Sequence, residues 1–438
     1  MAEEAIPVFN LKAVVQETGV AAPTLRTWER RYGLPRPQRT PSGRRLYSRR
    51  DVEMVRWLAA RQAEGMTIGQ AVALWRSLEE AGKDPLVEYP PRSAQHLPAG
   101  REALERWRDA WVAACLAFDE AAADAAFGQA LAMFPPETVC TEVLQEGLSW
   151  IGEAWYRGDA TVHQEHFASY LAARRVQFLL ASAPPISRPD LVMVVCPPGE
   201  SHAFGPLLLT YLLRRAGWGI VYLGADTPVA EMRATVQRSA PRWVIATAYH
   251  LPPVVGVQAL GALLEDMGVP LAFGGCIFNQ VSALRSCIRG HFLGERLQEA
   301  PARLEEWAVR PPPLPSPTPI PDAYRQAQIR YVDQEPFIRA RVFALLTHPY
   351  TRDLPEWLID YTFAHIRAVL MLGDMALADA YVDWLRGLRG GLSLPPGWVT
   401  PFLEAYRKGI EQYLGQEGAP LLEWLSQQIQ PNFWREKA

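Results

Sequence analysis

The sequence has few cysteines for its length, and their arrangement argues against two kinds of site. Only five cysteines occur among 438 residues, and no two of them form a Cys-x-x-Cys pair. An odd number without close pairs argues against a disulfide framework and against a zinc site built from thiolates. We therefore expect the reducing environment of the cytoplasm.

Long apolar runs are also missing. No stretch is long enough to span a bilayer, and no basic segment followed by an apolar run opens the chain, so no membrane contact is expected. Motifs for paired catalytic carboxylates, or for a nucleophile beside a base, do not occur either. The sequence therefore gives no reason to expect an enzyme, and no catalytic residue is predicted.

The net charge is low but unevenly distributed. The whole chain has a formal charge of −3. Residues 1–80, in contrast, carry 13 Arg and Lys against nine Asp and Glu, an excess of four positive charges. A basic end on an acidic body is typical of a regulator that contacts nucleic acid with one end.

Two proline-rich segments divide the chain. The first covers residues 84–100; the second, residues 310–322, has proline at seven of the eleven positions 311–321. Because proline lacks an N–H group and holds the backbone extended, both segments are predicted to be semi-rigid linkers. The predicted domains are residues 1–83, 101–187, 188–309 and 323–438.

The periodicity of apolar residues predicts a multidomain fold with α and α/β parts. In residues 101–187, Leu144, Leu148, Ile151 and Trp155 lie on one helical stripe, which predicts a four-helix bundle. The expected helices are residues 101–117, 119–133, 136–157 and 162–183.

After residue 188, short apolar runs alternate with helical stretches, which indicates a parallel, doubly wound sheet with its ligand site at the carboxyl ends of the strands. We expect strands at residues 191–196, 220–223, 243–248, 271–273 and near Phe292, with a short helix near 280–288.

The C-terminal part, residues 323–438, is expected to be an all-α domain of unassigned role. One helical stripe of this part is formed by Leu358, Thr362, His365, Val369 and Leu372. In this stripe His365 is most simply a packed histidine. The residues expected as core aromatics are Trp357, Tyr361, Phe363, Trp384, Phe402 and Tyr406.

Arginine is concentrated between residues 24 and 50. The segment contains T-L-R-x-W-E-R-R-Y-G at Thr24–Gly33 and S-G-R-R-L-Y at Ser42–Tyr47. Arginine contacts phosphates and bridges a guanine edge with its planar group, although a run of arginines alone would more simply be a solvated basic face.

With these motifs, residues 6–76 resemble the DNA-binding head of the MerR family. The resemblance implies a winged helix-turn-helix that binds a double-stranded DNA operator as a dimer. Leu25 and Trp28 are expected in the core of the head. The residues expected to face DNA are Thr24, Arg26, Arg30, Arg31, Arg44, Arg45 and Tyr47.

A loop with metal-binding chemistry follows the first strand of the predicted sheet. It contains E-x-H-x-x-G, formed by Glu200, His202 and Gly205. An imidazole can ligate a metal through one nitrogen while a carboxylate accepts the proton on the other. Glycine would allow a ligand to approach the backbone closely. Alone, this three-residue pattern is weak, since a loop histidine is usually a surface residue.

The loops after the next strands are rich in small residues. They read Y-L-G-A-D-T-P, A-T-A-Y-H and F-G-G. With them, residues 101–300 resemble the cobalamin-binding pair of a helical cap and a flavodoxin-like (Rossmann-like) domain, in the variant of CarH/LitR-type light-sensing regulators. The resemblance implies that His202 is the lower cobalt ligand. Further cofactor contacts are expected at Gly224, Asp226, Thr247, Gly274 and Gly275.

The cap carries a second motif of this group, W-x9-E-H, at Trp155, Glu165 and His166. In the group this trio holds the adenosyl group of adenosylcobalamin, although Trp155 also suits a core position of the bundle. The group often has histidine after the tryptophan, where this chain has Tyr156. A phenol is a poorer cobalt ligand, so either His163 or His166 would substitute or light would leave water on the cobalt. Whether light is the cue stays open.

Together these features predict a cobalamin-dependent, self-associating (dimeric or tetrameric) DNA-binding regulator, either a repressor or an activator. Two alternatives remain. The same module could sense haem, another tetrapyrrole or a redox cue through His202, His250 or His166. The shared cap and histidine loop also suit a corrinoid methyl carrier, which the basic head argues against.

Overall fold

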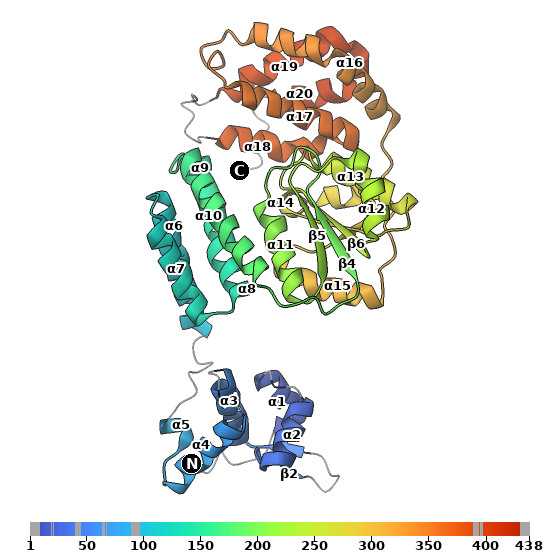
Figure 1. Cartoon of the computed structure of the whole chain (residues 1–438). Coiled ribbons are helices and arrows are strands. Elements are labelled where there is room, and N and C mark those ends of the chain that lie inside the picture. Colours follow the sequence, from blue (N-terminus) through green and yellow to red (C-terminus); the bar gives the residue numbers. More distant parts are fainter. Residues whose placement is uncertain are drawn as a thin grey trace. The chain divides into compact units, whose positions relative to one another are not determined.

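In a computed structural model, the chain folds into two compact units, Met1–Ala103 and Leu104–Ala438. The structure describes residues 9–18, 20, 22–39, 45–63, 66, 68–88, 97–388, 394 and 397–429 (Figure 1). Among these residues, no helix has the length and apolar character needed to cross a bilayer.

The first unit combines helices with a small antiparallel sheet of order β1-β3-β2. In α2, Leu25 and Trp28 are buried three residues apart, while the arginines between and after them are exposed, as an amphipathic helix requires. The expectation that Leu25 and Trp28 pack in the core is thus confirmed. The elements are β1 (Phe9–Asn10), α1 (Leu11–Thr18), α2 (Ala22–Tyr32), β2 (Gln38–Arg39), β3 (Arg45–Tyr47), α3 (Arg49–Ala63) and α4 (Ile68–Glu80).

The predicted linker at residues 84–100 is shorter than expected. A helical turn, α5 (Pro85–Glu88), lies inside it, and Leu86 packs against the core of the first unit. Asp84 also forms an ion pair with Arg50 of α3 at 3.0 Å. At the other end of the segment, α6 (Leu97–Leu116) begins within the predicted linker. Proline at the first position of a helix is compatible with helix formation, which explains the turn at Pro85.

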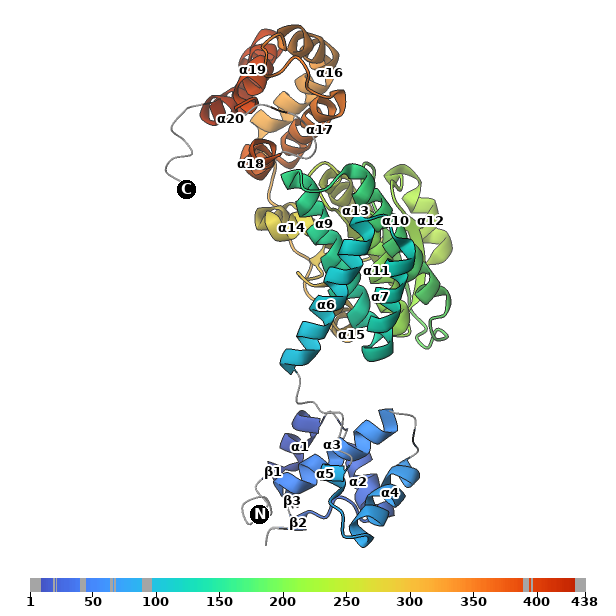
Figure 2. The same ribbon diagram turned by 90° about the vertical axis from the view of Figure 1, so that its left-hand side faces the viewer.

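The helical cap has the four predicted helices, with one interruption. The third is not a single α-helix, because a π-helical turn (Cys140–Gln145) separates α8 (Pro136–Val139) from α9 (Glu146–Arg157). A capping box of Thr161 and Gln164 starts α10 (Val162–Ala181). With α6 and α7 (Glu120–Met133), these helices form the bundle seen in Figures 1 and 2, in which α10 packs on α11 (Phe204–Arg215) of the next domain.

The predicted parallel sheet is confirmed, with strand order β5-β4-β6-β7-β8. The strands β5 and β6 lie on opposite sides of β4. The loops that follow β4 and β6 therefore diverge at a switch point, which is where α/β sheets bind ligands. The expected helix near 280–288 is instead a short α14 followed by a 3₁₀-helix at Ser282–Cys287. The strands are β4 (Leu191–Val195), β5 (Gly219–Gly224), β6 (Trp243–Thr247), β7 (Leu271–Gly274) and β8 (His291–Phe292). The main helices are α11 (Phe204–Arg215), α12 (Met232–Ser239), α13 (Val254–Asp266), α14 (Cys276–Gln280) and α15 (Ala300–Val309).

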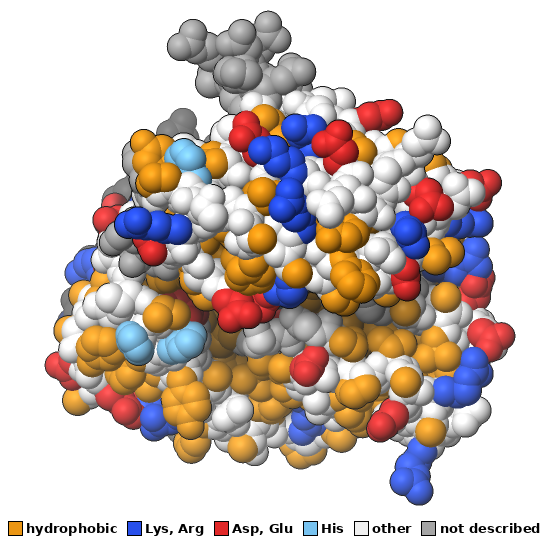
Figure 3. Space-filling model, turned by 90° about the horizontal axis from the view of Figure 1, so that it is seen from above, with side chains coloured by type: hydrophobic (Ala, Val, Ile, Leu, Met, Phe, Trp, Pro, Cys, Tyr) orange, Lys and Arg blue, Asp and Glu red, His pale blue; other side chains and the backbone are white. Residues whose placement is uncertain are grey.

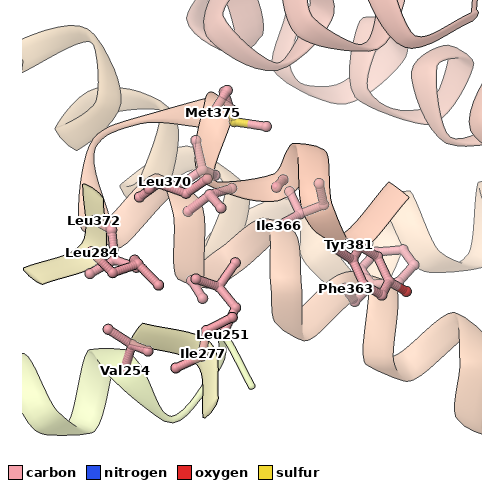
Figure 4. Packing of buried hydrophobic residues seen from close by; sticks show 14 of the residues in the cluster. Leu251, Val254, Ile277, Leu284, Phe363, Ile366, Leu370, Leu372, Met375 and Tyr381 are labelled. Atoms are coloured by element: carbon pink, nitrogen blue, oxygen red, sulfur yellow. The ribbon is translucent and has the colours of Figure 1, made fainter. Parts of the chain in front are cut away.

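The C-terminal helices are not a separate body behind a spacer. The proline-rich residues 311–320 contain neither helix nor strand, but the helices that follow share one buried apolar cluster with the sheet domain. Figure 4 shows residues of both parts at this contact, among them Leu251, Ile277 and Leu284 of the sheet domain and Ile366, Leu370 and Leu372 of α17. The helices are α16 (Asp322–Leu345), α17 (Glu356–Leu372), α18 (Asp379–Gly387), α19 (Val399–Leu414) and α20 (Ala419–Ile429).

Of the six expected core aromatics of this part, one is exposed and two are half-buried residues that pack against the buried cluster. Trp357 is 44% exposed, because it lies on the solvent side of α17 next to the buried Leu358. Tyr361 and Trp384 are half-buried, and their rings lie next to each other near the loop after β6. The other three, Phe363, Phe402 and Tyr406, are buried as predicted.

His365 is a packed histidine, as predicted. It is 3% exposed, its ring stacks on Tyr381 with centroids 3.8 Å apart, and its Nδ1 lies 2.8 Å from the Tyr361 carbonyl oxygen, to which it donates. Burial lowers the pKa of His365 to about 3. The folded protein therefore keeps this ring neutral at pH values where an unfolded chain would protonate it.

Acidification should for this reason destabilise the second unit through His365. Below about pH 6.5, His365 binds a proton in the unfolded chain. In the folded chain His365 stays neutral until the pH falls to its pKa of about 3. Between about pH 6 and pH 4, the free energy of unfolding should fall more steeply in wild type than in His365→Phe, by up to about 1.4 kcal/mol per pH unit. Urea titrations at several pH values measure both slopes, and equal slopes would contradict the assignment.

Candidate functional site

The site lies where the loops after β4, β5, β6 and β7 meet at the carboxyl edge of the sheet. Glu200 and His202 lie in the loop between β4 and α11, and Tyr249 and His250 follow the adjacent strand β6. The side of the second unit seen in Figure 3 is hollowed, and hydrophobic side chains gather in the hollow.

Glu200 holds His202 in place. The Glu200 side chain is 1% exposed, and its Oε1 accepts hydrogen bonds at 2.8 Å from both the His202 backbone N–H and the ring Nδ1. Its Oε2 accepts a bond at 2.5 Å from the Tyr249 backbone N–H, so that one carboxylate joins the β4 and β6 loops. Burial alone would raise the pKa of Glu200, but the hydrogen bonds from His202 and Tyr249 outweigh it and lower the pKa.

This arrangement leaves the second ring nitrogen of His202 available to a ligand. Because the Glu200 carboxylate accepts the proton on Nδ1, the neutral ring carries its lone pair on Nε2. The His202 side chain is 49% exposed, and the Tyr249 ring stacks on it with centroids 4.2 Å apart and an interplanar angle of 18°. A stacked phenol covers the face of the imidazole and leaves its edge free.

The predicted small residues of the loops have different surroundings. A Cβ added at Gly205 or Gly224 would meet no atom within 4 Å, so the space beside both is open. Gly275 has a φ of 122°, and a Cβ there would lie 2.0 Å from the Ala248 carbonyl oxygen, so only glycine fits. Gly274 is buried, and a Cβ on it would make only ordinary contact with Leu293.

The two polar loop residues predicted with them stabilise the loops. Asp226 Oδ1 accepts a hydrogen bond from Gly199 N–H at 2.8 Å. Thr247 is buried, and its Oγ1 lies 3.8 Å from the Cys196 Sγ. Both residues thus have protein partners, and any contact with a ligand stays a prediction.

The cap trio lies at the end of α9 and the start of α10. Trp155 is half-buried and packs against the cluster shared by the sheet and the C-terminal helices. Glu165 accepts a hydrogen bond from Ser169 Oγ at 2.6 Å, and His166 is 73% exposed. Although Tyr249 is half-exposed, desolvation raises the pKa of its phenol to about 12, with added contributions from Glu165 and Glu200.

Sequence reasoning missed Tyr249 and Tyr361, and it weighed His250 only as an alternative ligand. The His250 ring lies 5.3 Å from His202 and 5.4 Å from Tyr361 of α17, measured between centroids. Its buried Nδ1 has no hydrogen-bond partner and lies 3.8 Å from Glu200 Oε2, and burial lowers the pKa of His250. The ligand atoms of Glu200, His202 and His250 all lie within 4.8 Å of one another, which is a donor set suited to a metal.

In the first unit, four of the predicted DNA-facing residues are exposed on α2: Thr24, Arg26, Arg30 and Arg31. Tyr47 is not exposed, which corrects the expectation that it faces DNA. It is fully buried, and its hydroxyl donates to Glu29 Oε1 at 2.5 Å, while Arg45 donates to the other oxygen at 2.7 Å. These bonds join the wing to α2. Arg44 lies outside the described residues.

Comparison with known proteins gives matches in both units. Residues 9–78 match the family described as MerR HTH family regulatory protein, and residues 107–179 match the B12 binding domain. The chain is 33% identical over 236 residues to the HTH-type transcriptional repressor CarH of Myxococcus xanthus, covering 54% of this chain and 77% of CarH. It is 30% identical over 235 residues to the repressor CarA of the same organism, covering 53% of this chain and 74% of CarA.

Among solved structures, the monomethylamine corrinoid protein of Methanosarcina barkeri is similar at a TM-score of 0.39 and 19% identity. The match covers 48% of this chain and 99% of that one.

The geometry predicts one tautomer of His202. In wild type, Nδ1 should carry the proton, because the buried Glu200 carboxylate accepts it. In Glu200→Gln, the amide offers a single acceptor oxygen to a site with several N–H donors, so the proton should shift toward Nε2. ¹⁵N NMR of histidine-labelled protein reads the two ring nitrogens, with His348→Ala as a matched change at an exposed histidine. An Nε2–H ring in wild type would contradict the prediction.

Proposed function

Because the chain belongs to the family of MerR-type transcriptional regulators with a B12-binding domain, which includes the CarH and CarA repressors, we propose that it is a cobalamin-dependent regulator of transcription. The observation that carries this proposal is the hydrogen-bonded pair of Glu200 and His202 at the carboxyl edge of the sheet. This pair gives an imidazole with a fixed ring and a free Nε2, the form in which histidine ligates a metal.

The residues of the site fit cobalamin. His202 Nε2 offers one nitrogen to a cobalt ion, and the space beside Gly205 and Gly224 is open. When bound, cobalamin would supply a cobalt ion that an imidazole can ligate and that carries an exchangeable group. His202 would hold the lower side, Glu200 would keep the proton on Nδ1, and Tyr249 would keep the ring upright by stacking.

We further propose adenosylcobalamin as the form that is sensed. The half-buried indole of Trp155 offers a face for a nucleoside, and Glu165 and His166 offer polar groups beside it. Tyr156 is not assigned as an upper ligand, because its hydroxyl donates to a backbone carbonyl of α18. If light expels the adenosyl group, the exposed His163 and His166 are the available imidazoles.

The cofactor would act on DNA binding through assembly. A ligand shifts a protein between states only through its different affinity for them, so cobalamin must favour one packing of the cap. We propose that this packing sets self-association of the chain, and with it the binding of paired heads to an operator.

Cobalamin uptake tests the assignment of His202. His202→Ala should bind cobalamin about tenfold or more weakly than wild type, because the axial bond is lost. The absorption bands of the bound cofactor should also change. His348→Ala, at an exposed histidine in the turn between α16 and α17, is the matched control. Equal affinity and identical bands for His202→Ala would refute the assignment, and uptake of haem in place of cobalamin would favour the alternative tetrapyrrole.

DNA binding tests the head. Arg26→Ala should weaken binding to a labelled DNA duplex and lower the salt dependence of log K by about 0.9, the value for one phosphate contact. Tyr47→Phe should leave this slope unchanged, since Tyr47 is buried against Glu29, but should reduce stability by about 1 kcal/mol. Fluorescence anisotropy at several salt concentrations measures the slopes. An unchanged slope for Arg26→Ala would remove Arg26 from the interface.

A further inference from the structure

We propose that the C-terminal helices form a third wall of the cobalamin site, fastened to the cap by Tyr156. This rests on the proposed function, because it concerns the same cofactor. The wall consists of α17 and α18, and its contacts reach both the cap and the sheet loop that carries His250. Tyr156, Trp384 and Gly387 are accordingly positioning residues for the cofactor.

The contact with the cap is specific. The Tyr156 hydroxyl, at the end of α9, donates a hydrogen bond of 3.0 Å to the Trp384 carbonyl oxygen in α18. The two aromatic rings stack with centroids 6.1 Å apart and an interplanar angle of 26°. A polar bond and a ring stack between the same two residues fix both the distance and the orientation of the helices.

Gly387 makes room for this contact. A Cβ added at Gly387 would lie 1.7 Å from the Tyr156 hydroxyl oxygen and 2.7 Å from its ring carbon Cζ. No real pair of atoms tolerates such a separation, so a side chain at this position would displace Tyr156. Because position 387 is glycine, the Tyr156 phenol of the cap can occupy this space next to α18.

The same helices reach the sheet loop. The Trp384 ring lies 6.0 Å from the Tyr361 ring, and Tyr361 lies 5.4 Å from His250. His250 in turn lies 5.3 Å from His202. A continuous series of ring contacts thus leads from Tyr156 on the cap, through two residues of the C-terminal helices, to the proposed cobalt ligand.

These ring contacts should set the distance between the cap and the sheet loops that carry His202 and His250. Trp155 directly precedes Tyr156 on α9, so fastening Tyr156 also fixes the end of the helix that presents the indole. Holding the cap in place before the cofactor arrives reduces the ordering cost of binding. Loss of the contact should therefore weaken cobalamin binding without any change in a residue that touches the cobalt.

A double-mutant cycle on purified full-length protein tests this, with the dissociation constant of adenosylcobalamin as readout. Gly387→Ala and Tyr156→Ala should each weaken binding about tenfold. The double variant should bind about as well as Tyr156→Ala, because the added methyl group has nothing left to displace. Gly152→Ala, on α9 where a Cβ meets no atom within 4 Å, should bind like wild type.

The outcomes separate the two proposals. Wild-type binding by both single variants, or additive losses in the double variant, would overturn the third wall while leaving the cofactor assignment intact. If wild type itself takes up no cobalamin, the proposed function fails and the third wall fails with it. Thermal unfolding of the cofactor-free variants separates a local effect from misfolding, and Tyr156→Phe, which loses only the hydrogen bond, should show a smaller loss of affinity.

Discussion

The site depends on one buried carboxylate. Glu200 is almost completely enclosed, and it stays charged because two backbone N–H groups and an imidazole donate to it. Removing a donor from a buried anion is costly, so the three groups hold one another in place. The bonds also join the loops after β4 and β6, two strands that pair in the sheet at the point where the strand order reverses. The fold thus brings the two loops together, and the hydrogen bonds of Glu200 fix the orientation of the His202 ring.

The C-terminal helices supply neighbours to the site that the cap and the sheet domain do not provide. A cap and a sheet domain alone would leave the His250 side of the site and the end of α9 without these neighbours. Here Tyr361 packs near His250, and Trp384 accepts the hydrogen bond of Tyr156. The shared apolar cluster explains why a proline-rich segment does not separate the two parts. Burial of apolar surface between them outweighs the tendency of an extended segment to act as a spacer.

The DNA-binding head shows that a motif records which residues occur together, and not which of them touch a partner. Arg45 and Tyr47 belong to the motif of the wing, but both bind Glu29 of α2. Arg26 and Arg30, in the motif of α2, are exposed. The pattern is compatible with either role, because an internal ion pair and a phosphate contact use the same side chains.

The local structure was predictable from the order of the residues: the four cap helices, the five strands, and the E-x-H-x-x-G loop with Glu200 close to His202. These follow from periodicity and short spacings, which report whether a residue faces a core and which residues lie within a few positions of it. The stacking of Tyr249 on His202 and the hydrogen bond from Tyr156 to Trp384, 228 residues away, could be found only in the folded chain. Periodicity indicates that a side chain is buried, but the identity of its neighbour depends on how whole elements pack.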